Sequence, residues 1–395
     1  MTGIKSAVVA GHLCLDIIPD LSHLPGGDMT AMLQPGRLLN VGRAALSTGG
    51  AVSNTGVALH ILGVPTCLVA KLGTDPLGAA VRAVLDGYGP DLTAGITTDA
   101  SAGTSYTVIL NPPGRDRTFW HYAGANDTFS ADDVPFDLVA RADLFHFGYP
   151  PIMRRMYAEA GAGLVEVLRR ARETGATTSL DLAWPDPNSE AGRADWRSIL
   201  TAALPYVDLF TPSADELLFM LHRPTYERLL AAPGGLLENV TPALVEEVST
   251  GLLSLGAKVV LIKIGERGAY LHTADADSLT GMGRACPPDL AAWAGCQMWA
   301  PCFQVEVAGT TGSGDATIAG FLAALLRGLG PAEAMTAAVA VGACNVEAPD
   351  ALSGLRSWEA TMARLAAGWP RCPMHLQAPG WHWEEGIQML VRDQA

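Results

Sequence analysis

Short apolar runs, each bounded by Gly or Pro, alternate with helical patterns along most of this chain. The apolar runs are 7–10, 67–72, 144–147, 178–182, 209–211 and 259–264, and helical patterns between several of them are 55–62, 158–173, 214–221 and 243–255. Strands that alternate with helices form a mostly parallel sheet with helices on both faces. The pattern therefore predicts a three-layer α/β/α sandwich. Ligands of such folds bind beyond the carboxyl ends of the strands, so the loops there are the expected place of a site.

Two segments in the N-terminal third interrupt this alternation. Residues 15–48 are loop-like and rich in Gly and Pro, while 104–110 and 117–122 alternate apolar and polar residues around N-P-P-G at 111–114. A period of two is typical of a β-hairpin. Together the two segments predict a small β lid over the sheet, inserted at about 15–48 and 100–125 of a single domain that spans residues 1–368.

Two later segments are harder to interpret from the sequence. Residues 274–302 are long for a simple connection and contain three cysteines, and no role is readable in them. Residues 369–395 contain Trp369, Trp381 and Trp383. These aromatic side chains predict a C-terminal extension that packs onto the body of the domain.

Composition excludes several classes of protein. The 395 residues are 49% hydrophobic and 17% charged, enough to bury a large core. The net charge is -14 and no stretch concentrates Lys and Arg, which disfavours a nucleic-acid or acidic-membrane partner. Seven scattered cysteines without a C-x-x-C pair argue against a disulfide framework or a zinc site. Without an apolar run of about 18 residues or a signal-like N-terminus, we expect a cytoplasmic protein.

A glycine-rich segment near the C-terminal end carries the clearest chemistry. Residues 309–315, G-T-T-G-S-G-D, run directly into a helical repeat of apolar residues. The unpaired N–H groups and the dipole of a helix N-terminus favour an anion such as phosphate. The segment is not a P-loop, because Asp315 and Ala316 stand where Lys and Ser or Thr are required. It is also a poor dinucleotide fingerprint. A carboxylate beside phosphate indicates chemistry, although a plain helix cap is the alternative.

Two glycine-rich segments in order resemble the signatures of one family. Residues 49–54 (G-G-A-V-S-N) with 73–78 (G-T-D-P-L-G) resemble the N-terminal signature, and 309–315 resembles the C-terminal signature D-T-x-G-A-G-D. On these motifs the chain is similar to the ribokinase-like (PfkB) carbohydrate kinases from residue 11 to about residue 353. The resemblance implies that Asp315 removes the proton of a sugar hydroxyl as it attacks the γ-phosphate of ATP. The backbone of Gly312, Ser313 and Gly314 would form the anion hole.

The resemblance also implies residues on the sugar side of the site. Asp16 matches an acid that holds sugar hydroxyls, and Asn54 matches an Asn of the same pocket, while Gly50 would let the backbone approach the sugar. Taken alone, Asp16 and Asn54 are equally well explained as loop residues. Arg117 matches a lid residue, with a solvated strand Arg as the alternative. The lids of similar proteins often pair between subunits, so the resemblance also implies a possible homodimer through the lid.

On the nucleotide side, the segment T-P-S-A-D-E resembles the family element N-x-x-E. Glu216 would position magnesium, and Ser213 replaces the Asn as a weaker ligand. The turn K-I-G-E-R-G matches the family segment beside ATP, with Gly265 and Gly268 allowing close approach. Lys263 would face either phosphate or solvent. Thr310, in the turn before the anion hole, is also assigned to the nucleotide.

Two departures from the family pattern affect the expected activity. Gly309 replaces an Asp that helps relatives to bind an activating potassium ion, which puts K+ dependence in doubt. Gly148 and Tyr149 stand where ribose-specific members have a Glu, which argues against ribose; Tyr149 would contact another ring or base, or pack in the core. The expected function is therefore ATP- and Mg2+-dependent phosphorylation of a small sugar or sugar acid. A nucleoside kinase or a non-catalytic binding protein are the alternatives.

Overall fold

A ten-stranded sheet forms the centre of the computed structural model, which describes residues 3–24, 34–36, 38–114, 117–374, 376 and 378–393. Six neighbouring strands are parallel: β4 (Thr66–Val69), β1 (Ala7–Gly11), β9 (Leu144–Gly148), β10 (Thr177–Asp181), β11 (Leu209–Phe210) and β12 (Val259–Lys263). Four antiparallel strands continue the sheet: β13 (Ala269–Thr273), β14 (Gln297–Ala300), β16 (Met389–Arg392) and β15 (Trp381–Glu384). The sheet is thus mostly parallel where the site is expected.

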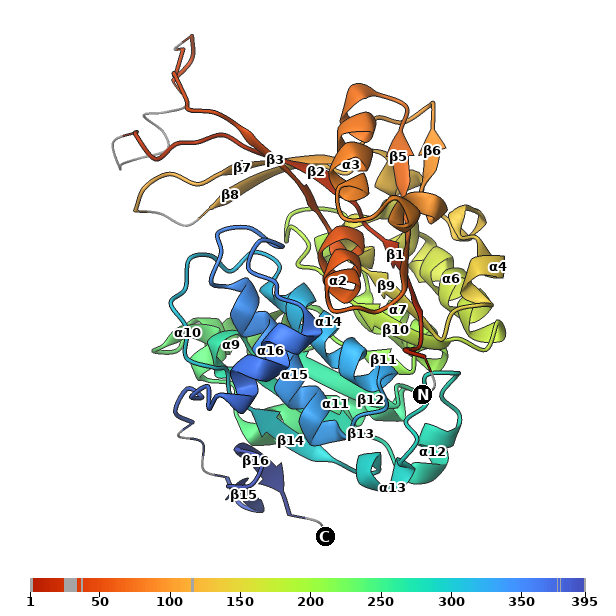
Figure 1. Cartoon of the computed structure of the whole chain (residues 1–395), viewed down its shortest axis with the longest axis vertical. Coiled ribbons are helices and arrows are strands. Elements are labelled where there is room, and N and C mark those ends of the chain that lie inside the picture. Colours follow the sequence, from red (N-terminus) through yellow and green to blue (C-terminus); the bar gives the residue numbers. More distant parts are fainter. Residues whose placement is uncertain are drawn as a thin grey trace.

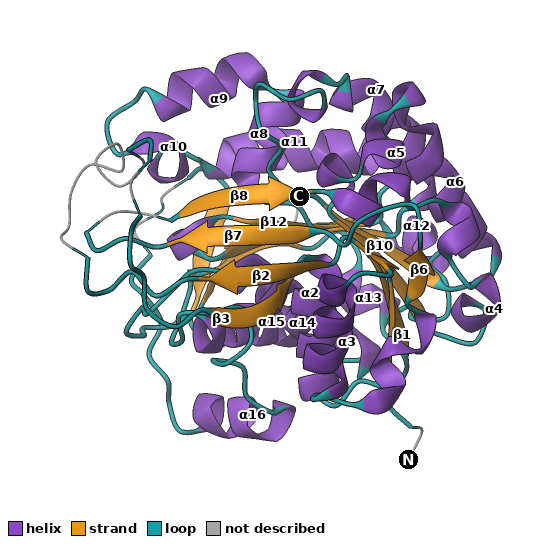
Figure 2. Ribbon diagram, turned by 90° about the horizontal axis from the view of Figure 1, so that it is seen from above, coloured by secondary structure: helices purple, strands orange, loops and turns teal. Residues whose placement is uncertain are grey.

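Helices cover both faces of this sheet, as Figure 2 shows from above. One layer contains α6 (Ala162–Glu173), α7 (Trp196–Ala203), α8 (Ala214–Leu221) and α11 (Pro242–Ser254), and the other contains α2 (Ala51–Ile61), α14 (Ser313–Leu326) and α15 (Pro331–Asn345). Successive strand residues point to opposite faces, so Val8 and Val9 of β1 belong to two different hydrophobic cores. Two covered faces explain the continuous apolar runs of these strands. The expected three-layer α/β/α sandwich is confirmed.

The remaining helices are shorter or lie at the periphery. They are α3 (Pro76–Asp86), α4 (Phe136–Val139), α5 (Arg154–Tyr157), α9 (Arg223–Leu230), α10 (Gly235–Glu238), α12 (Ala276–Thr280), α13 (Leu290–Trp293) and α16 (Trp358–Ala366). In the described part of the chain, none of the helices combines the length and apolarity that crossing a bilayer requires.

A separate four-stranded sheet extends from the body as the lid (Figure 1). Its order is β3 (Ala45–Gly49), β2 (Cys14–Ile18), β7 (Tyr106–Leu110) and β8 (Thr118–Tyr122), with β2 and β7 parallel. The hairpin expected around 111–114 is confirmed by the pairing of β7 with β8. The loop-like interpretation of 15–48 was wrong at both ends, because β2 and β3 are strands. These two strands pair across a long connection, so the sequence has no tight turn that would predict their pairing. Within that connection, residues 25–33 and 37 lie outside the described part.

The two segments that were hard to interpret supply strands or short helices. Residues 274–302 contain α12 and α13 and then β14, which joins the main sheet beside β13. After residue 368, Trp369 stacks on Phe303 with ring centroids 4.6 Å apart, and β15 and β16 continue the sheet from β14. The run 67–72 is divided: β4 ends at Val69, and β5 (Lys71–Gly73) pairs instead with β6 (Thr97–Asp99) in a two-stranded sheet.

Candidate active site

Asp315 lies in the first turn of α14, beyond the carboxyl ends of the parallel strands, and only 3% of it is exposed. Three side chains donate hydrogen bonds to its carboxylate. Asn54 Nδ2 and the Tyr149 hydroxyl donate to Oδ2 at 3.0 and 2.6 Å, and Thr55 Oγ1 donates to Oδ1 at 3.1 Å. Asn54 and Thr55 come from the neighbouring α2, and Tyr149 follows β9. The carboxylate is therefore held in one orientation by two separate elements.

The turn before Asp315 has the conformation that only glycine adopts easily. Gly312 has φ of 73°, and a Cβ there would lie 2.6 Å from the Cβ of Ala351. The first backbone bond of α14 runs from Ala316 N–H to Gly312 O at 2.8 Å, so the amides of Gly314 and Asp315 precede it. The Ser313 amide is already paired with Thr310 O at 3.3 Å. The helix N-terminus is thus arranged to attract an anion, with Ser313 contributing less than expected.

Lys263 brings a positive charge beneath this turn. Its Nζ lies 2.7 Å from Asp181 Oδ1, and a Cβ on Gly314 would lie 3.6 Å from the same Nζ. Although burial opposes it, the carboxylates of Asp181 and Glu216 raise the pKa of Lys263, so the ammonium group stays charged. The alternative in which Lys263 faces solvent was wrong. A cation at this depth suits the phosphate end of a nucleotide.

Ser213 and Glu216 form the N-terminus of α8 beside Lys263. Ser213 forms a β-bridge with Lys263, and its N–H donates to Glu216 Oε2 at 2.8 Å. Burial raises the pKa of Glu216 although Lys263 opposes the shift. A carboxylate oxygen is the donor that magnesium prefers, so Glu216 suits a magnesium ion brought by phosphates. Ser213, by contrast, contributes its backbone to the helix end.

The turn after β12 passes close to neighbouring backbone. Gly265 and Gly268 have φ of 53° and 89°. A Cβ on Gly268 would overlap the carbonyl oxygen of Ala300 in β14. Both glycines are therefore required for the turn itself, whether or not a nucleotide lies beside it.

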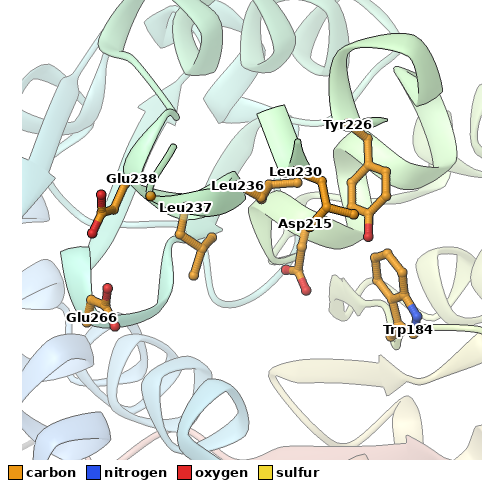
Figure 3. Close-up of a pocket in the computed structure, with 9 residues that line it drawn as sticks. Trp184, Asp215, Tyr226, Leu230, Leu236, Leu237, Glu238 and Glu266 are labelled. Atoms are coloured by element: carbon orange, nitrogen blue, oxygen red, sulfur yellow. The ribbon is translucent and has the colours of Figure 1, made fainter. Parts of the chain in front are cut away.

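A cavity of about 430 Å³ borders this turn, which contributes Glu266 to its wall (Figure 3). Its walls combine the aromatic rings of Trp184 and Tyr226 with the carboxylates of Asp215, Glu238 and Glu266. Three carboxylates repel a triphosphate. The phosphates of ATP are accordingly better matched by Lys263 and the N-terminus of α14 than by this cavity.

Asp16 lies on β2 of the lid, on the face toward the site, with 8% of its surface exposed. The thiol of Cys14 donates to Asp16 Oδ1 at 3.4 Å, and burial raises the pKa of Asp16 to about 6. A Cβ on Gly49 would overlap the carboxylate of Asp16, and one on Gly50 would overlap the ring of His12. Because Gly49 and Gly50 have no side chains, Asp16 and His12 can occupy this space.

Two further polar atoms near this place lack partners. Asn54 Oδ1 and His12 Nδ1 are buried and have no hydrogen-bond partner within the described ranges. The other ring nitrogen of His12 lies 3.4 Å from His121 Nε2 on β8, whose Nδ1 lies 3.0 Å from Thr107 Oγ1. Buried polar groups without partners are costly unless a ligand completes them. Sugar hydroxyls can act as both donors and acceptors, so they suit these atoms.

Arg117 of the lid contacts the glycine-rich turn. Its Nη2 donates to Thr310 Oγ1 at 2.8 Å. Arg117, which was expected on the sugar, thus lies at the entrance to the anion hole. Its partner there is Thr310, which was assigned to the nucleotide. The interpretation of Arg117 as a merely solvated strand residue was wrong.

Several residues of this site were missed in the sequence or given another role. The sequence could have pointed to Thr55, because it follows Asn54, and to Asp181, because it ends a buried strand. His12 had no comparable signal. Tyr149 was expected on a ring, a base or the core, but its hydroxyl contacts Asp315, which is 166 positions away in the sequence.

Gly309, the departure from the family signature, has no room for a side chain. A Cβ there would lie 2.9 Å from both Cα and O of Pro349. Such distances are shorter than real Cβ contacts, so the backbone must shift before an Asp fits. The backbone packed around Gly309 therefore leaves no space for the Asp that relatives have at this position.

Comparisons with known proteins identify the family of the chain. Residues 5–358 match the model of the pfkB family of carbohydrate kinases. A fructokinase-1 of Zea mays is 23% identical over 332 residues, covering 82% of this chain and 84% of the relative. A 2-dehydro-3-deoxygluconokinase of Bacillus subtilis is 26% identical over 348 residues, covering 84% and 90%.

Solved structures share the fold. The structure of Arabidopsis thaliana ribokinase complexed with ribose and ATP has a TM-score of 0.67 at 19% identity, and covers 92% of this chain and 99% of that chain. Fructokinase with bound ATP from Xylella fastidiosa gives the same four values. With a family match over most of its length and the corresponding fold, the chain belongs to the pfkB family of carbohydrate kinases.

Proposed function

We propose that this kinase transfers the γ-phosphoryl group of ATP to a hydroxyl of a small sugar or sugar acid, with Asp315 as the general base. The observation that carries the proposal is the position of Asp315. It is a buried carboxylate that two elements hold in place, between an anion-attracting helix N-terminus and the unpaired polar atoms under the lid. A base in this position would take the proton as the hydroxyl oxygen attacks phosphorus.

The positive groups on one side of Asp315 support phosphate binding there. The amide of Gly314, the N-terminal dipole of α14 and the ammonium of Lys263 converge on one place, and Arg117 reaches its edge from the lid. In phosphoryl transfer, alignment and charge neutralisation supply most of the catalysis. Magnesium bound with ATP would neutralise phosphate charge, and the carboxylate of Glu216 would hold it.

The other side of Asp315 supports a polyhydroxylated acceptor. Asp16, Asn54 and His12 supply polar atoms between the lid and the body, and Gly49 and Gly50 lack the Cβ atoms that would overlap Asp16 and His12. The named relatives act on fructose or on a sugar acid, which supports the same range of acceptors. A nucleoside is the second candidate, since the face of the lid that carries His121 also carries the exposed ring of Phe119.

Replacement of the proposed base tests the mechanism. Asp315→Asn keeps the shape of the side chain but removes its capacity to take a proton. We expect kcat to fall by about 10²–10⁴-fold, which is the contribution of general base catalysis, while the Kd for ATP measured by calorimetry is unchanged. Asp137→Asn on the exposed surface of α4 is the matched control. Sugar phosphorylation at the unchanged rate in Asp315→Asn would contradict the proposed function.

A substrate screen tests the acceptor. Production of ADP is measured with pentoses, hexoses, keto-deoxy sugar acids and nucleosides, each in sodium and in potassium buffer. We expect a sugar or sugar acid to give the highest kcat/KM. We also expect equal rates in both buffers, because Gly309 carries no carboxylate and its surroundings leave no space for one. A nucleoside as the best acceptor would replace the first candidate with the second.

A further inference from the structure

Tyr149 contacts the proposed base through the shortest of the three bonds to Asp315. Its hydroxyl donates to Asp315 Oδ2 at 2.6 Å. The residue lies between Gly148 and Pro150 with φ of 69° and ψ of 40°, a conformation that a bulky side chain rarely adopts. Burial and the neighbouring carboxylate of Asp315 raise the pKa of Tyr149 well above its ordinary value, so the phenol is protonated and acts as the donor.

This bond occupies a lone pair of Oδ2, the oxygen beside Asn54, where a sugar bound to Asn54 would donate its hydroxyl. Each carboxylate oxygen accepts about two hydrogen bonds. Oδ2 of Asp315 already accepts one from Asn54 Nδ2 at 3.0 Å and one from Tyr149, while Oδ1 accepts from Thr55. A general base removes a proton along a hydrogen bond that the reacting hydroxyl donates to it. In this arrangement Oδ2 accepts no further hydroxyl until one of its present donors leaves.

The phenol is the donor that a sugar can replace. Tyr149 presents the same chemical group as the acceptor, a hydroxyl. The ring of His12, which lies below the lid, has its centroid 6.2 Å from that of Tyr149. Asn54, by contrast, lies inside α2 and is fixed by the helix backbone. A sugar held beside His12 would therefore lie close to Tyr149.

We propose that Tyr149 occupies the place of the acceptor hydroxyl on Asp315 in the empty enzyme and yields it only to the sugar. The inference rests on the proposed role of Asp315 as base. Without this contact, water would donate to Oδ2 and attack the γ-phosphorus of ATP. The new bond joins the water oxygen to phosphorus, the bond to the β-phosphate oxygen breaks, ADP leaves and the proton passes to Asp315. Tyr149 is thus a positioning residue that suppresses ATP hydrolysis and weakens apparent sugar binding.

The first test measures ATP hydrolysis with Mg2+ and no sugar. In Tyr149→Phe, which keeps the ring and removes the hydroxyl, we expect hydrolysis to rise about tenfold, the size expected for one hydrogen bond to a charged group. With the best sugar from the screen, we expect KM to fall while kcat changes little. A merely structural tyrosine would lower kcat or thermal stability without raising hydrolysis. Tyr149→Leu provides a second variant without the hydroxyl.

Tyr88→Phe is the matched control, because it removes the same phenolic hydroxyl from an exposed residue outside the site. If Tyr149 acts by competition at Oδ2, Tyr88→Phe leaves sugar-free hydrolysis at the wild-type rate. An equal rise in Tyr149→Phe and Tyr88→Phe would overturn the inference, since the rise would then not come from the contact with Asp315. Unchanged hydrolysis together with unchanged or increased KM in Tyr149→Phe and Tyr149→Leu would overturn it as well.

The double variant separates this inference from the proposed function. If Asp315 is the base, Tyr149→Phe combined with Asp315→Asn loses the extra hydrolysis. Sugar phosphorylation at the wild-type rate in the single variant Asp315→Asn would contradict both the proposed function and this inference. Loss of transfer in Asp315→Asn, with no effect of Tyr149→Phe, would remove only the inference.

Discussion

Asp16, on the lid strand β2, is the carboxylate of the site whose charge changes in the ordinary pH range. Burial raises its pKa from 3.8 to about 6. Above that pH the carboxylate is ionised and accepts hydrogen bonds from sugar hydroxyls; below it the group is neutral and accepts them less strongly. We therefore expect the Kd for the sugar to increase as pH falls through about 6, approaching tenfold per pH unit if only the ionised form binds.

Calorimetry of sugar binding without ATP is the appropriate measurement for Asp16, because the nucleotide phosphates titrate in the same range. In Asp16→Asn the binding is expected to be weaker and nearly independent of pH. A wild-type Kd that stays constant from about pH 5 to 7.5 would show that Asp16 does not hold the sugar through its charge.

At the level of single residues, the sequence predicts a role only where the signal is local. Asp315 follows a glycine turn and opens a helix, and this is enough to identify a candidate base. Its partners are distant: Asn54 lies 261 positions away and Tyr149 lies 166 away. Lys263 shows the same difficulty, since its partner Asp181 is 82 positions away. A lone Lys at a strand end carries no signal that distinguishes an internal ion pair from solvent.

At the level of elements, burial on two faces determined which strands were predictable. All five residues of β1 and of β9 are buried, and their continuous apolar runs were predicted to within one residue. The lid strands have one face toward the site and one away from it, so polar and apolar residues alternate over only five positions. A partner strand that is distant in the sequence, as β3 is from β2, removes the turn signal as well.

The face of the lid that points away from the site is apolar. The strand register places Leu46, Ile17, Val108 and Trp120 side by side across all four strands, whereas Asp16 and His121 belong to the opposite face. Leu46 is 54% exposed and Trp120 is 46% exposed. Ile17 and Val108 between them are partly buried, so the row is exposed mainly at its two ends; exposed apolar patches are typical of protein interfaces. Together with the lid pairing that the family resemblance implies, the row favours a homodimer through the lid.

Substitution of Leu46 tests this lid interface. Leu46→Glu places a charge in the apolar row, and we expect the molecular mass in solution, measured by light scattering after gel filtration, to fall from dimer to monomer. Leu230→Glu on α9 is the matched control, because Leu230 has the same exposed fraction of 54% and lies outside the lid. A wild-type protein that is monomeric at micromolar concentration, or a Leu46→Glu variant that remains dimeric, would contradict the proposed interface.

At the scale of the whole molecule, the alternation of strands and helices was sufficient to predict three layers, but not how far the sheet extends. The family match ends at residue 358, and β15 and β16 lie beyond it. Segments rich in Trp, such as 369–395, predict packing without specifying a partner. The partner here is β14, which itself lies in the segment 274–302 that gave no readable pattern. Two uninformative segments thus complete the same edge of the sheet.

The C-terminal hairpin is expected to stabilise the fold without serving catalysis. Met389 and Leu390 of β16 are buried, Trp381 contacts Tyr270, and Arg392 lies 3.3 Å from Glu246. Removal of residues 379–395 exposes these contacts and the edge of β14. Loss of the two buried side chains alone is expected to reduce stability by about 3 to 6 kcal/mol. The parallel strands that position Asp315 are separated from this edge by β13 and β14.

We therefore expect the shortened chain to unfold at a clearly lower temperature while its KM for the sugar and for ATP stays within about twofold at temperatures where it remains folded. The open edge of β14 should also make it aggregate more readily, because unpaired strand edges are templates for further pairing. Thermal unfolding followed by circular dichroism, with kinetics on the same preparation, measures both effects. An unchanged unfolding temperature would show that the hairpin is dispensable for stability, and a selective loss of sugar or ATP affinity would assign it a part in the site.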